Sequence, residues 1–485
     1  MRKLYSFFIA VGILLAGSML SAQQEELIPL EDLKPLEISE KVLNPFGFSY
    51  GLNLNQTFYH DTALNQFLLI GAYRPFAMLL INENHLVTAR GKISYTHYEK
   101  KIASRKQDEV VGALELFNID YNFGKNQRLK AGRAFYKMGR GLLFANFADG
   151  LEFSRVASWG QYKALALYSA EYGAGACAIS IQGCGSSSNP FNVVPGQAAD
   201  VTLPDAGKRL FYGFEYISPG MFWGGRLSAL ALYSQDLNTG TRANGEKYTF
   251  NPWYASLGAR GILFTPALRY IVNYYYQGGS TFNQCRTSGG ATCTNSAPGT
   301  SAETSISAHA AMADVNYTIP FFEQLVKPGV VAQYAFATGD ADRVGGGTPA
   351  QASKSGNDTG FYYFGAFSGG LALKPRLHNM QVFRLGLNLR PLHFMYYFRN
   401  LAMSLKYSRY AKLEQAGPTS DPNVAIGTAA TSSNLGSAID LTLAWDYRSD
   451  VKFFYGFGTF SPGEAYKADK RSVTTVHLFS ATINL

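Results

Sequence analysis

The sequence predicts an all-β protein: a transmembrane antiparallel β-barrel of about 18 strands with short periplasmic turns and long extracellular loops. The composition suits twisted strands and turns, with 31 Tyr, 34 Phe, 49 Gly and only 16% charged residues. After residue 22, no window approaches the roughly 20 apolar residues that a transmembrane helix needs. Tracts of alternating apolar and polar residues recur along the chain instead. A soluble, secreted all-β protein is the alternative.

The clearest alternating tract lies near the C-terminus. Large apolar side chains share one parity, and mainly polar ones share the other: Ile439, Leu441, Leu443, Trp445 and Tyr447 against Asp440, Thr442, Ala444, Asp446 and Arg448. Successive side chains of a strand point to opposite faces, so this tract separates lipid from water. We therefore expect Trp445 and Tyr447 in an inner aromatic belt, and Asp440, Asp446 and Arg448 in the lumen wall.

The N-terminus predicts secretion. Residues 1–22 begin with Met1-Arg2-Lys3, continue with an apolar run and end at Ser21-Ala22, as a cleaved signal peptide does. Residues 23–46 form an acidic periplasmic segment, which is either a disordered tail or a small stopper that reaches into a positive lumen. Residues 47–485 then form the barrel, in a bacterial outer membrane.

Eighteen tracts have the length of tilted membrane strands, and an even number returns both termini to the periplasm. They lie near 49–59, 66–80, 86–98, 109–123, 127–137, 149–157, 160–171, 208–217, 225–236, 252–263, 268–279, 305–318, 328–338, 381–391, 399–411, 436–448, 451–460 and 475–485. The long connections 172–207, 280–304, 339–380 and 412–435 then all fall outside. Residues 361–373 resemble a strand, but a strand there would put the connection after Ala411 on the wrong side, so we expect a packed loop.

The four cysteines form two close pairs, Cys177 with Cys184 and Cys285 with Cys293, in Gly/Ser/Thr/Asn-rich stretches. We expect two local disulfides that staple outer loops in an oxidising compartment. No histidine lies in either stretch, which argues against a metal site.

Strand parity predicts a mostly cationic lumen. The inward set contains Arg90, Lys92, Arg209, Arg260, Arg269, Arg384, Arg390, Lys406 and Arg448. The formal net charge of +9 falls to +7 without Arg2 and Lys3, and a positive lumen concentrates anions. The alternative is that these residues pair with Asp440, Asp446 and Glu215 and brace the wall. Glu115 shares parity with outward aromatics, so either a β-bulge intervenes or the register is wrong.

Several short motifs resemble the alginate export porins, an outer-membrane family of 18-stranded barrels. They are Leu129–Arg133, Gly139–Leu142, Asp149–Phe153, Phe336–Asp340, Phe361–Gly365, and Phe460–Gly463 with Ala465, in the family's order. The resemblance implies an electropositive constriction, passage of an anionic polysaccharide, and a monomer. It carries Arg133 and Arg140 over as conduit residues. We take from it an architecture and an anionic preference, without alginate itself.

The function that these observations predict is a passive outer-membrane channel for anionic solutes, such as an anionic polysaccharide or its fragments, with outer-membrane lipid as the other partner. We expect no cofactor, no nucleic-acid partner and no enzyme activity, because none of the seven histidines lies in a nucleophile motif. The alternative is an adhesin or a structural barrel that acts through its long loops, where partner binding concentrates.

Overall fold

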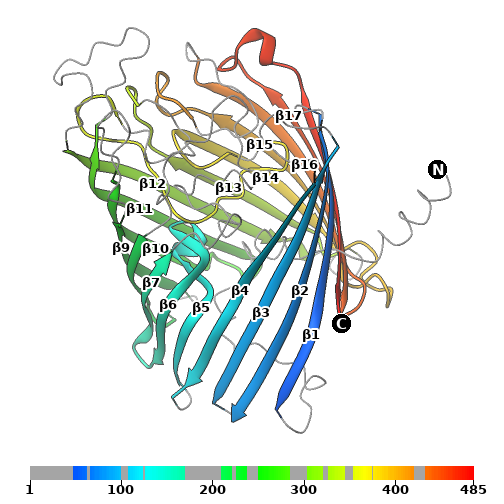
Figure 1. Cartoon of the computed structure of the whole chain (residues 1–485). Coiled ribbons are helices and arrows are strands. Elements are labelled where there is room, and N and C mark those ends of the chain that lie inside the picture. The colour runs from blue at the N-terminus through cyan, green and yellow to red at the C-terminus, as the bar shows by residue number, and fades with distance from the viewer. Residues whose placement is uncertain are drawn as a thin grey trace.

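The computed structural model is a closed antiparallel barrel of 18 strands (Figure 1). The structure describes residues 47–62, 66–82, 84–99, 108–123, 126–169, 209–220, 225–237, 249–283, 303–320, 326–343, 353–373, 375–419 and 432–485. Each strand pairs with its neighbours along the chain, and β1 pairs with β18. Both the fold class and the strand count confirm the prediction.

The strands account for most of the wall. They are β1 (Phe48–Asp61), β2 (Gln66–Asn82), β3 (His85–Tyr98), β4 (Asp108–Asn122), β5 (Gln127–Met138), β6 (Phe144–Ala157), β7 (Gly160–Ser169), β8 (Arg209–Ile217), β9 (Arg226–Asp236), β10 (Asn251–Ile262), β11 (Leu268–Phe282), β12 (Glu303–Thr318), β13 (Gly329–Ala337), β14 (Met380–Leu389), β15 (Leu401–Ala411), β16 (Asn434–Asp446), β17 (Val451–Pro462) and β18 (Thr474–Asn484).

The two faces of the wall differ as the alternation predicts. On β16, the outward Ile439 is 45% exposed while the inward Asp440 is 4% exposed. The outward face carries large apolar side chains on nearly every strand, which suits contact with lipid tails. No helix among the described residues is long and apolar enough to span a membrane.

Short turns gather at one end of the barrel, here called the inner end, and the strand ends that the long connections join lie at the other, the outer end (Figure 1). Trp445 points outward near the inner end, where its ring stacks on Phe398 at 5.0 Å and its indole N–H donates to the Tyr397 carbonyl at 2.8 Å. This aromatic group matches the expected inner belt.

A β-bulge resolves the parity conflict at Glu115. Arg90 of β3 pairs with Leu116, whereas the next residue, Gly91, pairs with Leu114, so Glu115 is the extra residue on β4. The bulge turns Glu115 to the lumen, while Phe117 and Ile119 stay outward, 57% and 37% exposed. The first of the two predicted explanations is therefore confirmed.

The apolar core of this molecule lies inside the barrel. It contains the end of the β5–β6 hairpin and part of the connection between β13 and β14, together with inward side chains of the wall. Residues 361–373 form no strand, and Phe361 to Phe364 are at most 2% exposed. The predicted packed loop is confirmed, and it packs inward.

Candidate functional site

A cationic cluster lines the lumen on β2, β3 and β4. Glu115 accepts a hydrogen bond from Arg74 at 3.3 Å and forms an ion pair with Arg90 at 2.8 Å. Lys92 follows Arg90 at the same parity, so it lies on the same inward face. Three cations surround one carboxylate, which leaves a formal excess of two positive charges. We call Arg74, Arg90, Lys92 and Glu115 the cationic cluster.

The adjacent wall is charged but balanced. On its inward face, Arg128 pairs with Asp120 at 2.8 Å and Lys163 with Glu215 at 3.0 Å. Lys130 lies between them, directly opposite Glu152 in the strand register. Three cations thus meet three carboxylates, so the charge excess of this side of the lumen comes from the cationic cluster.

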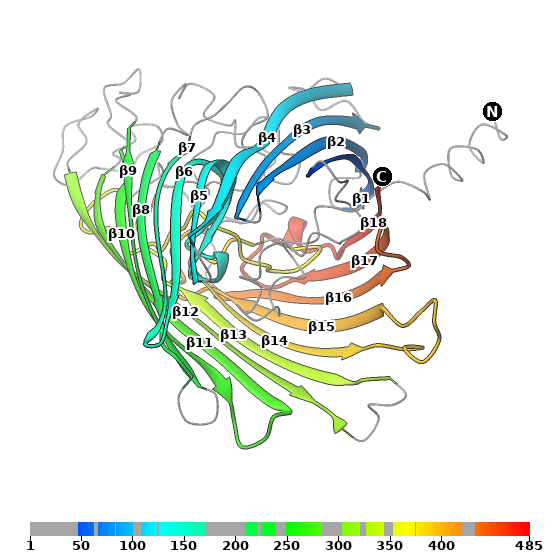
Figure 2. The same ribbon diagram turned by 90° about the horizontal axis from the view of Figure 1, so that it is seen from below.

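The end of the β5–β6 hairpin folds into the lumen (Figure 2). It turns at Gly139, Arg140 and Gly141, which have φ of 58°, 58° and 82°. Glycine adopts this left-handed conformation freely, which explains why a Gly-Arg-Gly motif stands there. The guanidinium of Arg140 pairs with Asp314 of β12 at 2.7 Å.

The connection between β13 and β14, residues 338–379, meets this hairpin end inside the barrel. The Phe364 N–H donates to the Leu143 carbonyl at 2.9 Å, and the Ala366 N–H donates to the Gly141 carbonyl at 2.9 Å. The rings of Phe364 and Phe211 lie 5.0 Å apart. We call residues 353–373 and 375–379 of this connection the inward loop. Together with the hairpin end, the inward loop forms a constriction.

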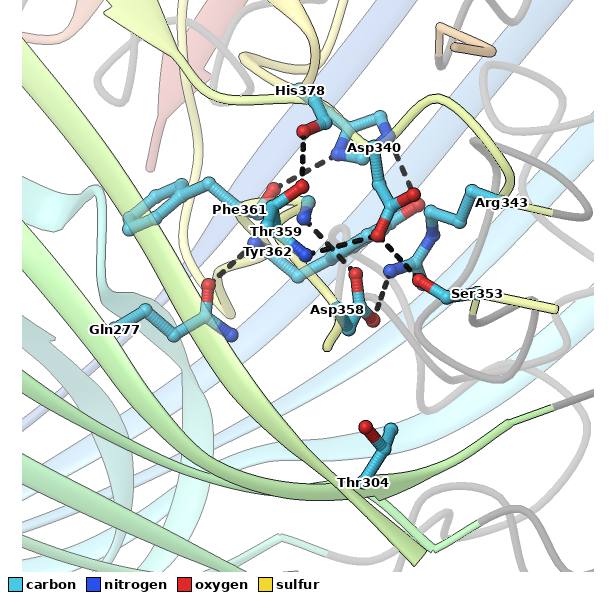
Figure 3. Close-up of polar contacts among 12 residues, drawn as sticks. Gln277, Thr304, Asp340, Arg343, Ser353, Asp358, Thr359, Phe361, Tyr362 and His378 are labelled. Carbon is cyan, nitrogen blue, oxygen red and sulfur yellow. Dashed lines mark hydrogen bonds and ion pairs between the residues drawn. The ribbon is translucent and has the colours of Figure 1, made fainter. Parts of the chain in front are cut away.

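A buried polar network holds the base of the inward loop (Figure 3). Arg343 forms an ion pair with Asp358, and Asp340 accepts from the Ser353 hydroxyl and from the Thr359 N–H, the latter at 3.0 Å. Arg343 and Asp358 are 4% and 0% exposed. Because the two opposite charges are paired, neither is an uncompensated buried charge, which would destabilise the fold.

His378 completes that network as a neutral ring. Burial lowers the pKa of His378 to about 3, and the nearby Arg343 acts in the same direction. Its Nδ1 lies 3.1 Å from the Phe361 carbonyl, which can only accept, so Nδ1 carries the proton. Nε2 then accepts from the Tyr362 hydroxyl at 3.4 Å.

Arg384 of β14 fastens the inward loop to the wall. Its guanidinium donates to the Ser368 and Gly369 carbonyls of the loop at 2.8 and 2.6 Å. It also donates to Ser408 Oγ at 3.0 Å and Gln333 Oε1 at 2.7 Å. Asp440 of β16, two strands away from Arg384, accepts from the Leu371 N–H at 3.0 Å. Arg384 is 3% exposed, so it braces the constriction and is not open to the lumen.

Most of the other residues predicted to line the pore lie inside the barrel, either facing the lumen or buried in an ion pair. Arg90, Lys92, Arg140, Arg260, Arg269 and Lys406 lie on the inward face or inside the lumen, with Lys406 opposite Asp440 in the register. Arg209 is also inward, but it is buried in an ion pair with Asp236 at 2.7 Å. For Arg209 and Arg384, the bracing alternative describes the contacts better than an open pore wall.

Three predicted positions differ from the structure. Arg133 lies on the outward parity, opposite Phe117, and its guanidinium forms a two-pronged pair with Asp149 at 2.9 Å for both bonds. The reason is that Leu129, Ala131 and Phe135, which share its parity, take the lipid side. Arg390 and Arg448 lie in inner turns, because β14 ends at Leu389 and β16 at Asp446.

Sequence reasoning missed Arg74, Arg128, Lys130 and Lys163, which supply much of the inward charge. Arg128 and Lys130 alternate with Leu129 and Ala131, so parity was a usable signal for them. The signal peptide, the acidic segment 23–46 and the four cysteines lie outside the described residues.

Comparisons with known proteins agree with the fold. The family model described as alginate export matches residues 239–478, which confirms the predicted resemblance over the C-terminal half of the barrel. No curated protein matches the chain. Similar solved structures from Pseudomonas aeruginosa include OccK8 (OprE), at 10% identity and a TM-score of 0.52, OpdQ, at 10% and 0.51, and OpdK with vanillate, at 9% and 0.50. Each alignment covers 90% of this chain and 98% of the other, and the likeness shows an outer-membrane porin fold.

Proposed function

We propose that this protein is a passive outer-membrane channel that prefers anionic solutes. The observation that carries the proposal is the cationic cluster, in which Arg74, Arg90 and Lys92 surround the single carboxylate of Glu115 on the inward face. A lumen wall with a local excess of fixed positive charge raises the local concentration of anions and slows cations.

The constriction directs solutes toward this cluster. The hairpin end and the inward loop pack against the inner faces of β8, β11, β12 and β14. On the opposite part of the wall, Arg90 of the cationic cluster keeps 32% of its side chain exposed, whereas Arg74, Asn55 and Thr57 beside it are at most 6% exposed. We infer that solutes pass Arg90 on the side of β1 to β4.

The solute class follows from the same chemistry. Arginine pairs with carboxylates in a two-pronged geometry, whereas lysine acts as a point charge. The matching family is described as alginate export, and the similar OpdK was crystallised with vanillate, a carboxylate. We propose carboxylated solutes, including an acidic polysaccharide or its fragments, as the natural cargo.

The test is the reversal potential of the purified protein in a planar bilayer under a potassium chloride gradient. Wild type should show anion selectivity, and Arg90→Ala with Lys92→Ala should reduce it, while Glu115→Gln should increase it. Lys467→Ala with Lys470→Ala removes two exposed cations outside the lumen and should change nothing. A wild-type channel without anion preference, or an unchanged reversal potential in the lumen variants, would contradict the proposal.

A further inference from the structure

Among the residues that the structure describes, the barrel wall is incomplete between β4 and β5 toward the outer end. The two strands pair from Asn122 with Arg128 up to Phe117 with Arg133, and there the pairing stops. β4 continues for nine more residues, Asp108 to Leu116, paired on its other side with β3. In the described part of the chain, no backbone hydrogen bond joins those nine residues to β5, β6 or β7.

The inward bend of the β5–β6 hairpin causes this gap. β6, the second strand of the hairpin, also leaves the wall: its pairing with β7 begins only at Asp149 with Tyr168. Beyond this point the hairpin contacts β11 and β8: the Tyr275 hydroxyl donates to the Gly139 carbonyl at 3.2 Å, and the rings of Phe144 and Phe211 lie 4.7 Å apart. Figure 1 shows β4 diverging from β5 and β6.

An ion pair stands where the strands separate. Arg133 and Asp149 face outward there, and Arg133 also donates to the Leu114 carbonyl at 3.3 Å, on the unpaired edge of β4. Charges on a lipid-facing wall are costly, and unpaired strand edges are not tolerated in lipid. Both features are consistent with a place where polar groups or water meet the membrane.

The two sides of the gap differ in character. Its outward rim is apolar, with Val110, Leu114 and Phe117 exposed by 68%, 53% and 57%. Directly inside β4 lies the cationic cluster, since Glu115 of the bulge contacts Arg74 and Arg90. A molecule that fits both sides has an anionic head and an apolar tail.

We propose that this gap is a lateral entrance through which a single-chain anionic amphiphile, such as a long-chain carboxylate, passes between the outer leaflet and the lumen. The head group binds Arg90 and Lys92, and the tail lies over Leu114 and Phe117. The inference deepens the proposed function, because it rests on the same cationic lumen and adds the cargo's apolar part and route.

The test measures binding of hexanoate, octanoate, decanoate and dodecanoate to the protein in lipid nanodiscs by calorimetry, with empty nanodiscs subtracted. Affinity should rise roughly fourfold per methylene that the rim covers. Leu114→Ala with Phe117→Ala should weaken dodecanoate binding at least tenfold and leave hexanoate binding unchanged. The matched control is Phe383→Ala with Leu385→Ala, the same residue types on the outward face of β14, 46% and 45% exposed, and it should bind like wild type.

The outcomes separate this inference from the proposed function. Anion selectivity with no dependence on chain length, or with equal effects of the rim and control variants, would overturn the lateral entrance and leave the channel intact. Chain-length-dependent binding without anion selectivity would overturn the channel alone. A wild type that is dimeric in nanodiscs, with monomeric rim variants, would show that a second copy covers the β4 edge, which also overturns the entrance.

Discussion

Arg384→Ala should release the inward loop. The side chain donates two hydrogen bonds to loop carbonyls, at Ser368 and Gly369, and it is 3% exposed. A hydrogen bond to a charged group contributes about 1.5 to 3 kcal/mol, so the docked loop loses about 3 to 6 kcal/mol. Because 1.4 kcal/mol is about a factor of ten, the undocked population should rise at least about a hundredfold.

Trypsin provides the assay, because Arg376 lies within the inward loop. When docking is fast relative to cleavage, the cleavage rate follows the undocked population. Cleavage after Arg376, followed by mass spectrometry on the folded barrel in detergent, should accelerate by about the same factor. Arg384→Lys keeps the charge but not the planar fork, so it should fall between wild type and Ala.

Arg390→Ala is the control, since this arginine follows β14 in an inner turn and is exposed. It should cleave after Arg376 at the wild-type rate. If Arg384→Ala also cleaves there at the wild-type rate while remaining folded, the reasoning about the clamp is refuted. The single-channel current of Arg384→Ala should in addition become noisier.

Two further predictions concern the same constriction. Gly365 packs against the carbonyls of Gly141 and Leu142, so Gly365→Ala should weaken the contact between loop and hairpin by about 1 to 3 kcal/mol. Tryptic cleavage of the loop should then be faster. In the control Gly71→Ala, the new Cβ meets only a Tyr73 side-chain atom at 3.9 Å, so cleavage should keep the wild-type rate. The pKa of His378 is about 3 when docked and 6.5 when released, so docking is fully stable above 6.5 and weakens as pH falls toward 3, by about 2 kcal/mol at pH 5. A conductance or cleavage rate that stays constant between pH 7 and pH 5 would contradict this pH dependence of docking. His378→Gln should remove the part of the pH dependence that is due to the His378 ring.

The strand pattern could be predicted because parity is a local property. A tract such as Ile439 to Asp446 states by itself which side chains meet lipid and which meet water. Strand ends are less well defined locally, which is why Arg390 and Arg448 were placed in the wall and lie in turns.

The contacts that build the constriction could not be predicted because they join distant parts of the chain. Arg140 reads as a basic residue in a Gly-rich turn, and only folding brings Asp314 to it. Likewise, parity gave Arg384 an inward direction, but the carbonyls of Ser368 and Gly369 that it meets belong to a loop with no regular pattern. Arg133 is a different case, because its conduit role came from the resemblance alone, while it shares its parity with the outward Leu129, Ala131 and Phe135.

The seam between β1 and β18 places a condition on how the barrel is made. Asn53 donates to Asn484, which is 431 residues later in the chain, and the Leu485 N–H donates to the Leu52 carbonyl at 2.9 Å. Contacts between residues so far apart form slowly, because a long loop must close first. The first strand therefore keeps an unpaired edge until the last strand has been synthesised and exported. Such an edge promotes aggregation, so assembly requires that the whole chain be held unfolded and then closed in a late step.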